Sequence, residues 1–118
     1  MRFIHTADWH LGRLFFGRHL TDDQSRVLDE LLHLVRESHA EAVVLAGDVY
    51  DRAVPPVEAV ELFDETLSRL QLEEKCKVIC IAGNHDSAAR LGFGSRLLAG
   101  GGVFVAGQLR ADAPPIVL

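Results

Sequence analysis

Three short apolar runs of this sequence each end in side chains that can bind a metal ion. Carboxylate, imidazole and amide groups follow the runs without a thiolate among them, a mixture that suits Mn²⁺, Fe²⁺ or Zn²⁺ and disfavours Cu⁺. A carboxylate has two oxygens, so an aspartate in the middle of such a set could bridge two ions. The side chains concerned are Asp8, His10, Asp48, Asn84 and His85.

The apolar runs predict buried strands, because they are short and rich in β-branched residues. Helical patterns separate them, and the order strand, helix, strand, helix, strand predicts a parallel sheet with right-handed crossovers. Parallel strands end at one edge of a sheet, which would bring the polar clusters together. Asp8 and His10 are two residues apart and would face the same side of an extended segment. The strands are expected at residues 1–7, 42–46 and 77–82.

Two helices are predicted between these strands, the first at residues 21–38 and the second following Pro55 and Pro56. Thr21 and Gln24 have the spacing of a capping box at the start of the first helix. Apolar residues recur at intervals of three and four in both helices and mark the buried faces. These residues are Val27, Leu28, Leu31, Leu32 and Val35 in the first helix, and Val60, Phe63, Leu67 and Leu70 in the second.

The pattern is weaker after the third strand. A short helix is expected within residues 87–99, with a break at Gly92 or Gly94, followed by a strand at 103–105. Residues 114–118 resemble the start of a further strand. Because the chain stops within this strand-like sequence, we expect it to be a fragment of something longer.

Composition excludes several classes of protein. With 118 residues, 48% of them hydrophobic, the chain has the length of one domain, and its formal net charge of −5 argues against a broad basic face for nucleic acid. Bound divalent ions would cancel part of this acidic excess where a phosphate approaches. No apolar run reaches the ~18 residues of a membrane span, so a cytoplasmic protein is expected. Cys76 and Cys80 would lie roughly 13 Å apart along a strand, too far for a disulfide, and are expected to be reduced thiols.

Each polar cluster alone has an ordinary explanation. Asp8 with His10 could form a solvated turn, Asp48 could simply precede a helix, and residues 83–86 could form a turn in which Gly and Asn adopt left-handed conformations. Their shared position directly behind predicted strands makes a two-metal site the better explanation.

These motifs resemble those of the calcineurin-like metallophosphoesterases. Asp8-Trp9-His10, Gly47-Asp48 and Gly83-Asn84-His85-Asp86 match the pattern of the family, and the resemblance is most specific to its SbcD-type nucleases. It covers almost the whole chain. The resemblance implies an α/β fold with a layered metallophosphoesterase-type sheet of parallel strands and flanking helices, of which residues 1–118 would be the N-terminal part.

The resemblance also implies roles for the site residues. Asp8, His10 and Asp48 would hold one Mn²⁺, and Asp48 and Asn84 would hold a second, while His85 would lie beside the scissile phosphate. Three further histidines of the family have no counterpart in this chain, so the second site would be incomplete and the chain alone inactive. Asp51 corresponds to a phosphatase aspartate that orients the motif histidine, which predicts a hydrogen bond from its carboxylate to His85.

The remaining histidines are weaker candidates for metal binding. Of these, His19 alone is expected at the ligand edge of the sheet, where a loop histidine is usually solvated. His5 is expected to be a hydrogen-bonded core residue beneath the site. His33 and His39 belong to the first helix and its end, with His39 at the far edge of the sheet.

Four arginines are candidate phosphate contacts near the predicted site. Phe15 and Phe16 lie between two of them, and two alternatives remain open: the rings could stack on DNA bases, or they could pack beneath the loop. The arginines are Arg13, Arg18, Arg52 and Arg90.

Three functions remain in competition. The first is a Mn²⁺-dependent DNA nuclease of repair and recombination, for which the resemblance implies a partner, an SMC-like coiled-coil ATPase subunit of the SbcC type, and a possible homodimer. The second is a phosphomonoesterase, because residues 47–52 also resemble an element of serine/threonine protein phosphatases that ends in the arginine Arg52. The third is a truncated, non-catalytic binding module.

Overall fold

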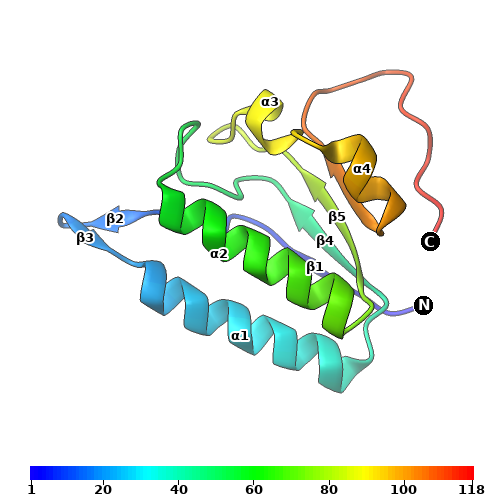
Figure 1. Cartoon of the computed structure of the whole chain (residues 1–118), viewed down its shortest axis with the longest axis horizontal. Helices are drawn as coiled ribbons and strands as arrows, with labels where there is room; N and C mark the ends of the chain where they lie inside the picture. Colours follow the sequence, from blue (N-terminus) through cyan, green and yellow to red (C-terminus); the bar gives the residue numbers. More distant parts are fainter.

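The computed structural model describes residues 1–118 as a parallel sheet with helices packed on it (Figure 1). No helix is both long and apolar enough to cross a membrane. The strand order of the sheet is β1-β4-β5-β6, and all neighbouring strands in it are parallel. The α/β fold with parallel strands is therefore confirmed. The strands of this sheet are β1 (Phe3–Thr6), β4 (Ala42–Ala46), β5 (Lys77–Ile81) and β6 (Val103–Ala106), and the helices are α1 (Thr21–Ser38), α2 (Val57–Ser68), α3 (Ala88–Leu91) and α4 (Ser95–Gly100).

Alternation along the two central strands determines which face carries the helices. Val43 and Leu45 of β4 are fully buried. In β5, Cys80 is fully buried and Val78 is 1% exposed. All four belong to clusters that include residues of α1 and α2, which lie side by side on this face (Figure 1). Burial of this face supplies the main hydrophobic stabilisation of the fold.

The opposite face of the sheet is partly open. Phe3 is 60% exposed and Ile81 is 47% exposed, although both lie within strands. His5 lies on the same face as Phe3, is exposed, and its imidazole makes no hydrogen bond, so the prediction of a hydrogen-bonded core histidine was wrong. The reason is the alternation of β1, which directs Ile4 toward the helices and its neighbours outward.

The first helix begins and ends as predicted, but its capping box was wrong. Leu20 is the N-cap residue and no side chain caps the helix. Gln24 instead turns its side chain toward the loop after β1. Val27 was also assigned wrongly to the buried face, since it is 63% exposed, whereas Leu28 beside it is 5% exposed.

The second helix starts directly after Pro56, which adopts an extended conformation as N-cap. Phe63 and Leu70 are buried as predicted, but Val60 is 44% exposed, so its assignment to the buried face was wrong. A π-helical turn, Arg69–Glu73, continues the helix and carries Leu70 into the core beneath the sheet.

The predicted break in the third helical region is confirmed. Gly94 has a φ of 71° and separates α3 from α4, and β6 then adds to the sheet beside β5. Residues 114–118 form no strand, so that prediction was wrong. Their apolar composition resembled a strand, but no neighbouring strand is present to pair with them.

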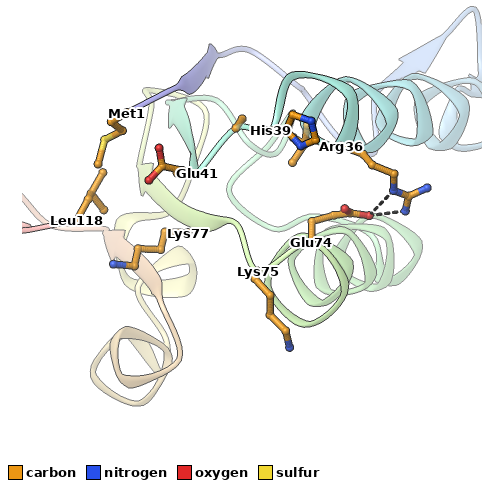
Figure 2. A pocket seen from close by; sticks show the side chains of 10 residues that line it. Met1, Arg36, His39, Glu41, Glu74, Lys75, Lys77 and Leu118 are labelled. Carbon is orange, nitrogen blue, oxygen red and sulfur yellow. Dashed lines mark hydrogen bonds and ion pairs between the residues drawn. The ribbon is translucent and has the colours of Figure 1, made fainter.

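A hollow of about 460 Å³ lies at the end of the sheet where the strands begin (Figure 2). His39 borders it, at the far edge as expected. The guanidinium of Arg36 bonds to Glu74 here and lowers the pKa of that carboxyl. The polar clusters lie at the other end of the strands, so this hollow is remote from them.

Both cysteines are buried free thiols, as expected. Burial raises the pKa of Cys76 to about 11 and that of Cys80 to about 12. Both thiols are therefore protonated near neutral pH, and neither is an activated nucleophile or thiolate ligand.

The two faces of α1 yield a direct test. Leu28→Ala should lower the free energy of unfolding by ~2–5 kcal/mol, because it leaves a cavity in the core. Val27→Ala, one residue earlier, should change it by no more than about 0.5 kcal/mol. Urea unfolding followed by circular dichroism measures both, and equal losses would contradict the placement of the buried face.

Candidate metal centre

The loops that follow β1 and β4 run side by side beyond the sheet. The backbone N–H of Asp8 donates to Gly47 O at 3.0 Å, and that of His10 donates to Asp48 O at 3.0 Å. These bonds extend the parallel pairing of the two strands into the polar clusters, so that the first cluster is held in register with the second. Two more bonds continue the series, from Leu11 N to Val49 O and from Asp51 N to Leu11 O.

Three of the proposed ligands have a left-handed backbone. The φ angles of Asp8, His10 and Asp48 are 57°, 47° and 48°. Such values are uncommon for residues other than glycine, and they concentrate at sites where function requires them. The prediction that Asp8 and His10 lie in an extended segment was therefore wrong, although their side chains do meet.

The side chains of these three residues converge on one point. His10 Nε2 lies 3.8 Å from Asp8 Oδ1 and 3.7 Å from Asp48 Oδ2. One ligand atom from each residue lies within 4.8 Å of the other two, a spacing that could hold a metal ion. Asp48 is 7% exposed and is the most deeply buried of the three.

Because Gly83 has no side chain, the Asp48 carboxylate can lie directly against its backbone. A Cβ at position 83 would lie 2.2 Å from Asp48 Oδ1, so only glycine fits. The same oxygen accepts a hydrogen bond from the backbone N–H of His85 at 2.9 Å. The second and third clusters are thus in direct contact through Asp48.

Asp86 joins the same two loops, a role that the sequence analysis missed. Its carboxylate accepts hydrogen bonds from the backbone N–H groups of Val49 at 3.1 Å, Tyr50 at 2.8 Å and Gly83 at 2.9 Å. Burial, with a smaller contribution from the Asp86 charge, raises the pKa of Tyr50 to about 12. The pattern Gly-Asn-His-Asp indicated a turn, but nothing in it showed which backbone groups the last residue would bind.

The predicted carboxylate bond from Asp51 to His85 is absent. His85 Nδ1 instead lies 3.1 Å from the backbone carbonyl oxygen of Asp51. The Asp51 carboxylate lies 3.2 Å from His10 Nδ1, a buried atom that meets no partner at hydrogen-bond geometry. Asp51 therefore faces the proposed ligand His10 rather than His85, and the two imidazoles stand edge to face with ring centroids 5.1 Å apart.

Asn84 lies between two residues of this network but is itself exposed. Its neighbours Gly83 and His85 contact Asp86 and Asp48, which anchors the backbone on both sides of it. Its proposed metal-binding amide stays a prediction. The other candidate histidine, His19, belongs to a hairpin outside the convergent group and is exposed.

Gln24 and Trp9 support the loop of the first cluster. The Gln24 amide donates to Trp9 O at 3.2 Å and to His10 O at 2.9 Å, and it accepts from Gly12 N at 3.3 Å. Trp9 Nε1 donates to Thr6 Oγ1 at 3.0 Å. A glutamine three residues after a threonine normally indicates a capping box, so nothing in the sequence showed that Gln24 would bind the ligand loop.

The four candidate arginines all lie exposed at the surface and form no ion pair. Each guanidinium is therefore available to an external anion. Their role as phosphate contacts stays a prediction. They are Arg13, Arg18, Arg52 and Arg90.

The chemistry of the donor set fits a divalent metal ion. Two carboxylates and one imidazole converge from the ends of two strands, held by a strained backbone and by hydrogen bonds from neighbouring loops. Hard or borderline divalent cations prefer such oxygen and imidazole donors. A second cluster, made of His10, Asp51 and His85, also brings ligand atoms within 4.8 Å of one another. We favour the first cluster because both of its carboxylates face the same nitrogen, His10 Nε2.

Comparison with known proteins agrees with the motifs. The family model of the calcineurin-like phosphoesterases matches residues 1–116. The chain is 37% identical over 118 residues to the SbcD subunit of the nuclease SbcCD from Staphylococcus epidermidis. It is 36% identical over 118 residues to the same subunit from Staphylococcus saprophyticus. The matches cover 100% of this chain but 32% and 31% of the relatives, so the chain spans about a third of their length.

Replacement of Asp86 tests the link between the two loops. Asp86→Asn should lower the free energy of unfolding by ~1–3 kcal/mol, because its amide NH₂ would face at least one backbone N–H that now donates to a carboxylate oxygen. The control Asp112→Asn, at a side chain that is 77% exposed, should change it by no more than about 0.5 kcal/mol. Urea unfolding measures both, and indistinguishable values would contradict the proposed link.

Proposed function

The chain belongs to the calcineurin-like phosphoesterase family, and on this premise we propose that it carries the metal-binding part of a DNA nuclease that hydrolyses phosphodiester bonds. The observation that carries this proposal is the convergence of Asp8, His10 and Asp48 within 4.8 Å at the ends of two parallel strands. The similarity to the SbcD subunit of the nuclease SbcCD supports a nucleic-acid substrate.

We propose that the site binds two divalent cations and that the preferred metal is Mn²⁺. When bound, such ions polarise a phosphoryl oxygen and make water a stronger nucleophile. Asp8, His10 and Asp48 would hold one of them, and Asp48 and Asn84 would contribute to the second. The Asp51 carboxylate beside His10 Nδ1 would keep the opposite nitrogen, Nε2, directed at the ion, a common arrangement for metal-binding histidines.

We assign His85 to the scissile phosphate. Its Nδ1 lies 3.1 Å from a carbonyl oxygen, which can only accept, so that nitrogen carries a hydrogen. When the ring is doubly protonated, Nε2 also carries a hydrogen and can donate it to the leaving oxygen or stabilise the charge there. Asp51 therefore orients the His85 ring through its backbone carbonyl rather than through its carboxylate.

We further propose that the chain is the N-terminal part of a longer nuclease that acts in DNA repair and recombination in the cytoplasm. The relatives are named as one subunit of an SbcCD nuclease, which supports a coiled-coil ATPase subunit of the SbcC type as partner. A second copy of the nuclease is a further candidate partner. The isolated chain lacks counterparts of three family histidines and is proposed to be inactive.

A phosphomonoester is the second candidate substrate. Arg52 is exposed and free of ion pairs, as a residue that grips a terminal phosphoryl group would be. Assays with single-stranded DNA and with p-nitrophenyl phosphate, on protein from the complete reading frame, distinguish the two functions. If only the monoester were hydrolysed, the proposed nuclease function would be wrong and a phosphatase function would take its place.

Asp48 is the residue most critical to the proposed activity, because it contributes to both ions. In the protein from the complete reading frame, Asp48→Ala should reduce Mn²⁺-dependent DNA hydrolysis by at least ~100-fold, since even residues that only orient metal ligands cost 10–100-fold. Asp112→Ala is the matched control. If the Asp48 variant cleaved DNA as fast as the control, the assignment of Asp48 to both ions would be wrong.

The number of ligands predicts the metal stoichiometry of the 118-residue chain. Asp8, His10 and Asp48 can hold one ion firmly, whereas Asp48 and Asn84 offer the second ion only two protein ligands, and few fixed ligands give weak binding. Titration calorimetry with Mn²⁺ should therefore detect at most one tight site per chain. Two tight sites would show that the missing histidines are not required.

A further inference from the structure

A small hairpin with an aromatic tip projects from the protein next to the metal centre. Its strands are β2 (Leu14–Phe15) and β3 (Arg18–His19), and it extends from the end of the molecule opposite the two termini (Figure 1). Phe15 is 58% exposed and Phe16 is 94% exposed, with ring centroids 4.5 Å apart. The alternative that these rings pack beneath the loop is therefore wrong.

The turn of the hairpin is strained where the aromatic residue stands. Phe16 and Gly17 have φ angles of 49° and 74°, both left-handed. Turns of this kind favour Asn-Gly or Gly-Gly, and a bulky residue in the first position is unusual. An exposed, strained phenylalanine contributes nothing to the core, so its place at the tip indicates a function outside the fold.

Two arginines flank the two rings in the sequence. Arg18 is paired across the hairpin with Phe15 and His19 with Leu14, so the guanidinium and the ring of Phe15 belong to the same face. The segment from residue 11 to residue 20 contains Arg13, Arg18 and His19 and no carboxylate. Aromatic rings beside unpaired arginines form the kind of surface that binds nucleic-acid strands through bases and phosphates together.

The base of the hairpin is fixed to the loop that carries His10. Arg13 N donates to His10 O at 3.1 Å, and Leu20 N donates to Arg13 O at 3.2 Å. Gly12 approaches Pro56 so closely that a Cβ there would lie 2.8 Å from the proline ring. A base held at the tip would therefore keep its strand at a constant distance from the proposed metal ligands.

We propose that Phe15 and Phe16 at the tip of this hairpin stack on unpaired bases of a DNA strand, while Arg13 at its base and Arg18 contact the phosphates, and that the hairpin holds this strand against the metal centre. The inference rests on the proposed nuclease function and specifies its substrate class: DNA with unpaired bases near the scissile phosphate, as in single strands or frayed ends. Within a duplex each base pair is covered by its stacked neighbours, so away from its ends an intact duplex offers the rings no face on which to stack.

The test measures binding of the 118-residue chain to fluorescent 12-nucleotide probes by anisotropy in EDTA at low salt. One probe is oligothymidine and the other is an abasic strand of equal charge. Wild type should bind oligothymidine about tenfold more tightly than the abasic strand, because stacking on each base adds affinity that phosphate contacts do not. Phe15→Ala/Phe16→Ala should lose this preference, whereas Phe16→Trp should keep it.

Phe3→Ala is the matched control, since Phe3 is 60% exposed on a different surface. It should bind both probes as wild type does. Equal affinity of the double variant and wild type for oligothymidine, or a wild type that does not distinguish the probes, would overturn the proposal and leave the rings to a protein partner. EDTA removes the ions from the assay, so this result is independent of whether the protein hydrolyses DNA.

Discussion

Two loops at the edge of the sheet are joined by the carboxylate of Asp86, which accepts three backbone hydrogen bonds. The N–H groups of Val49, Tyr50 and Gly83 lie beyond the ends of β4 and β5, where the regular pairing of strands has stopped. Hydrogen bonds to a charged acceptor are stronger than those between neutral groups. Since Gly83 in turn lies directly against the Asp48 carboxylate, the position of this proposed bridging ligand depends on the link.

The left-handed backbone at Asp8, His10 and Asp48 is tolerated because the surrounding contacts determine it. Backbone bonds hold the first loop to the second, the Gln24 amide holds it to α1, and Asp86 holds the second loop to the third. Strain of this kind costs of order 1–3 kcal/mol per residue. These contacts thus fix the orientation of the three proposed metal ligands.

The sequence could predict the strands, the helices and the convergence of polar clusters, because periodicity and the geometry of parallel sheets determine them. It could not predict the partners of Gln24, Asp51 and Asp86, since these depend on which backbone and ring atoms lie close after folding. Local patterns were misleading where they had two explanations: Gln24 resembled a cap, and the apolar residues 114–118 resembled a strand. The predicted burial of His5 was wrong for a different reason. Alternation along a strand indicates that it has two faces, but it does not show which face the helices cover.

The central claim is that Asp8, His10 and Asp48 form a preformed site for one divalent ion. Crystals of the chain grown with Mn²⁺, with anomalous scattering recorded at the manganese edge, test it most directly. The account predicts a peak that contacts one carboxylate oxygen of each aspartate and Nε2 of His10, with the three backbones still left-handed as they are here. Manganese bound elsewhere, or bound only after these backbones leave the left-handed conformation, would contradict it.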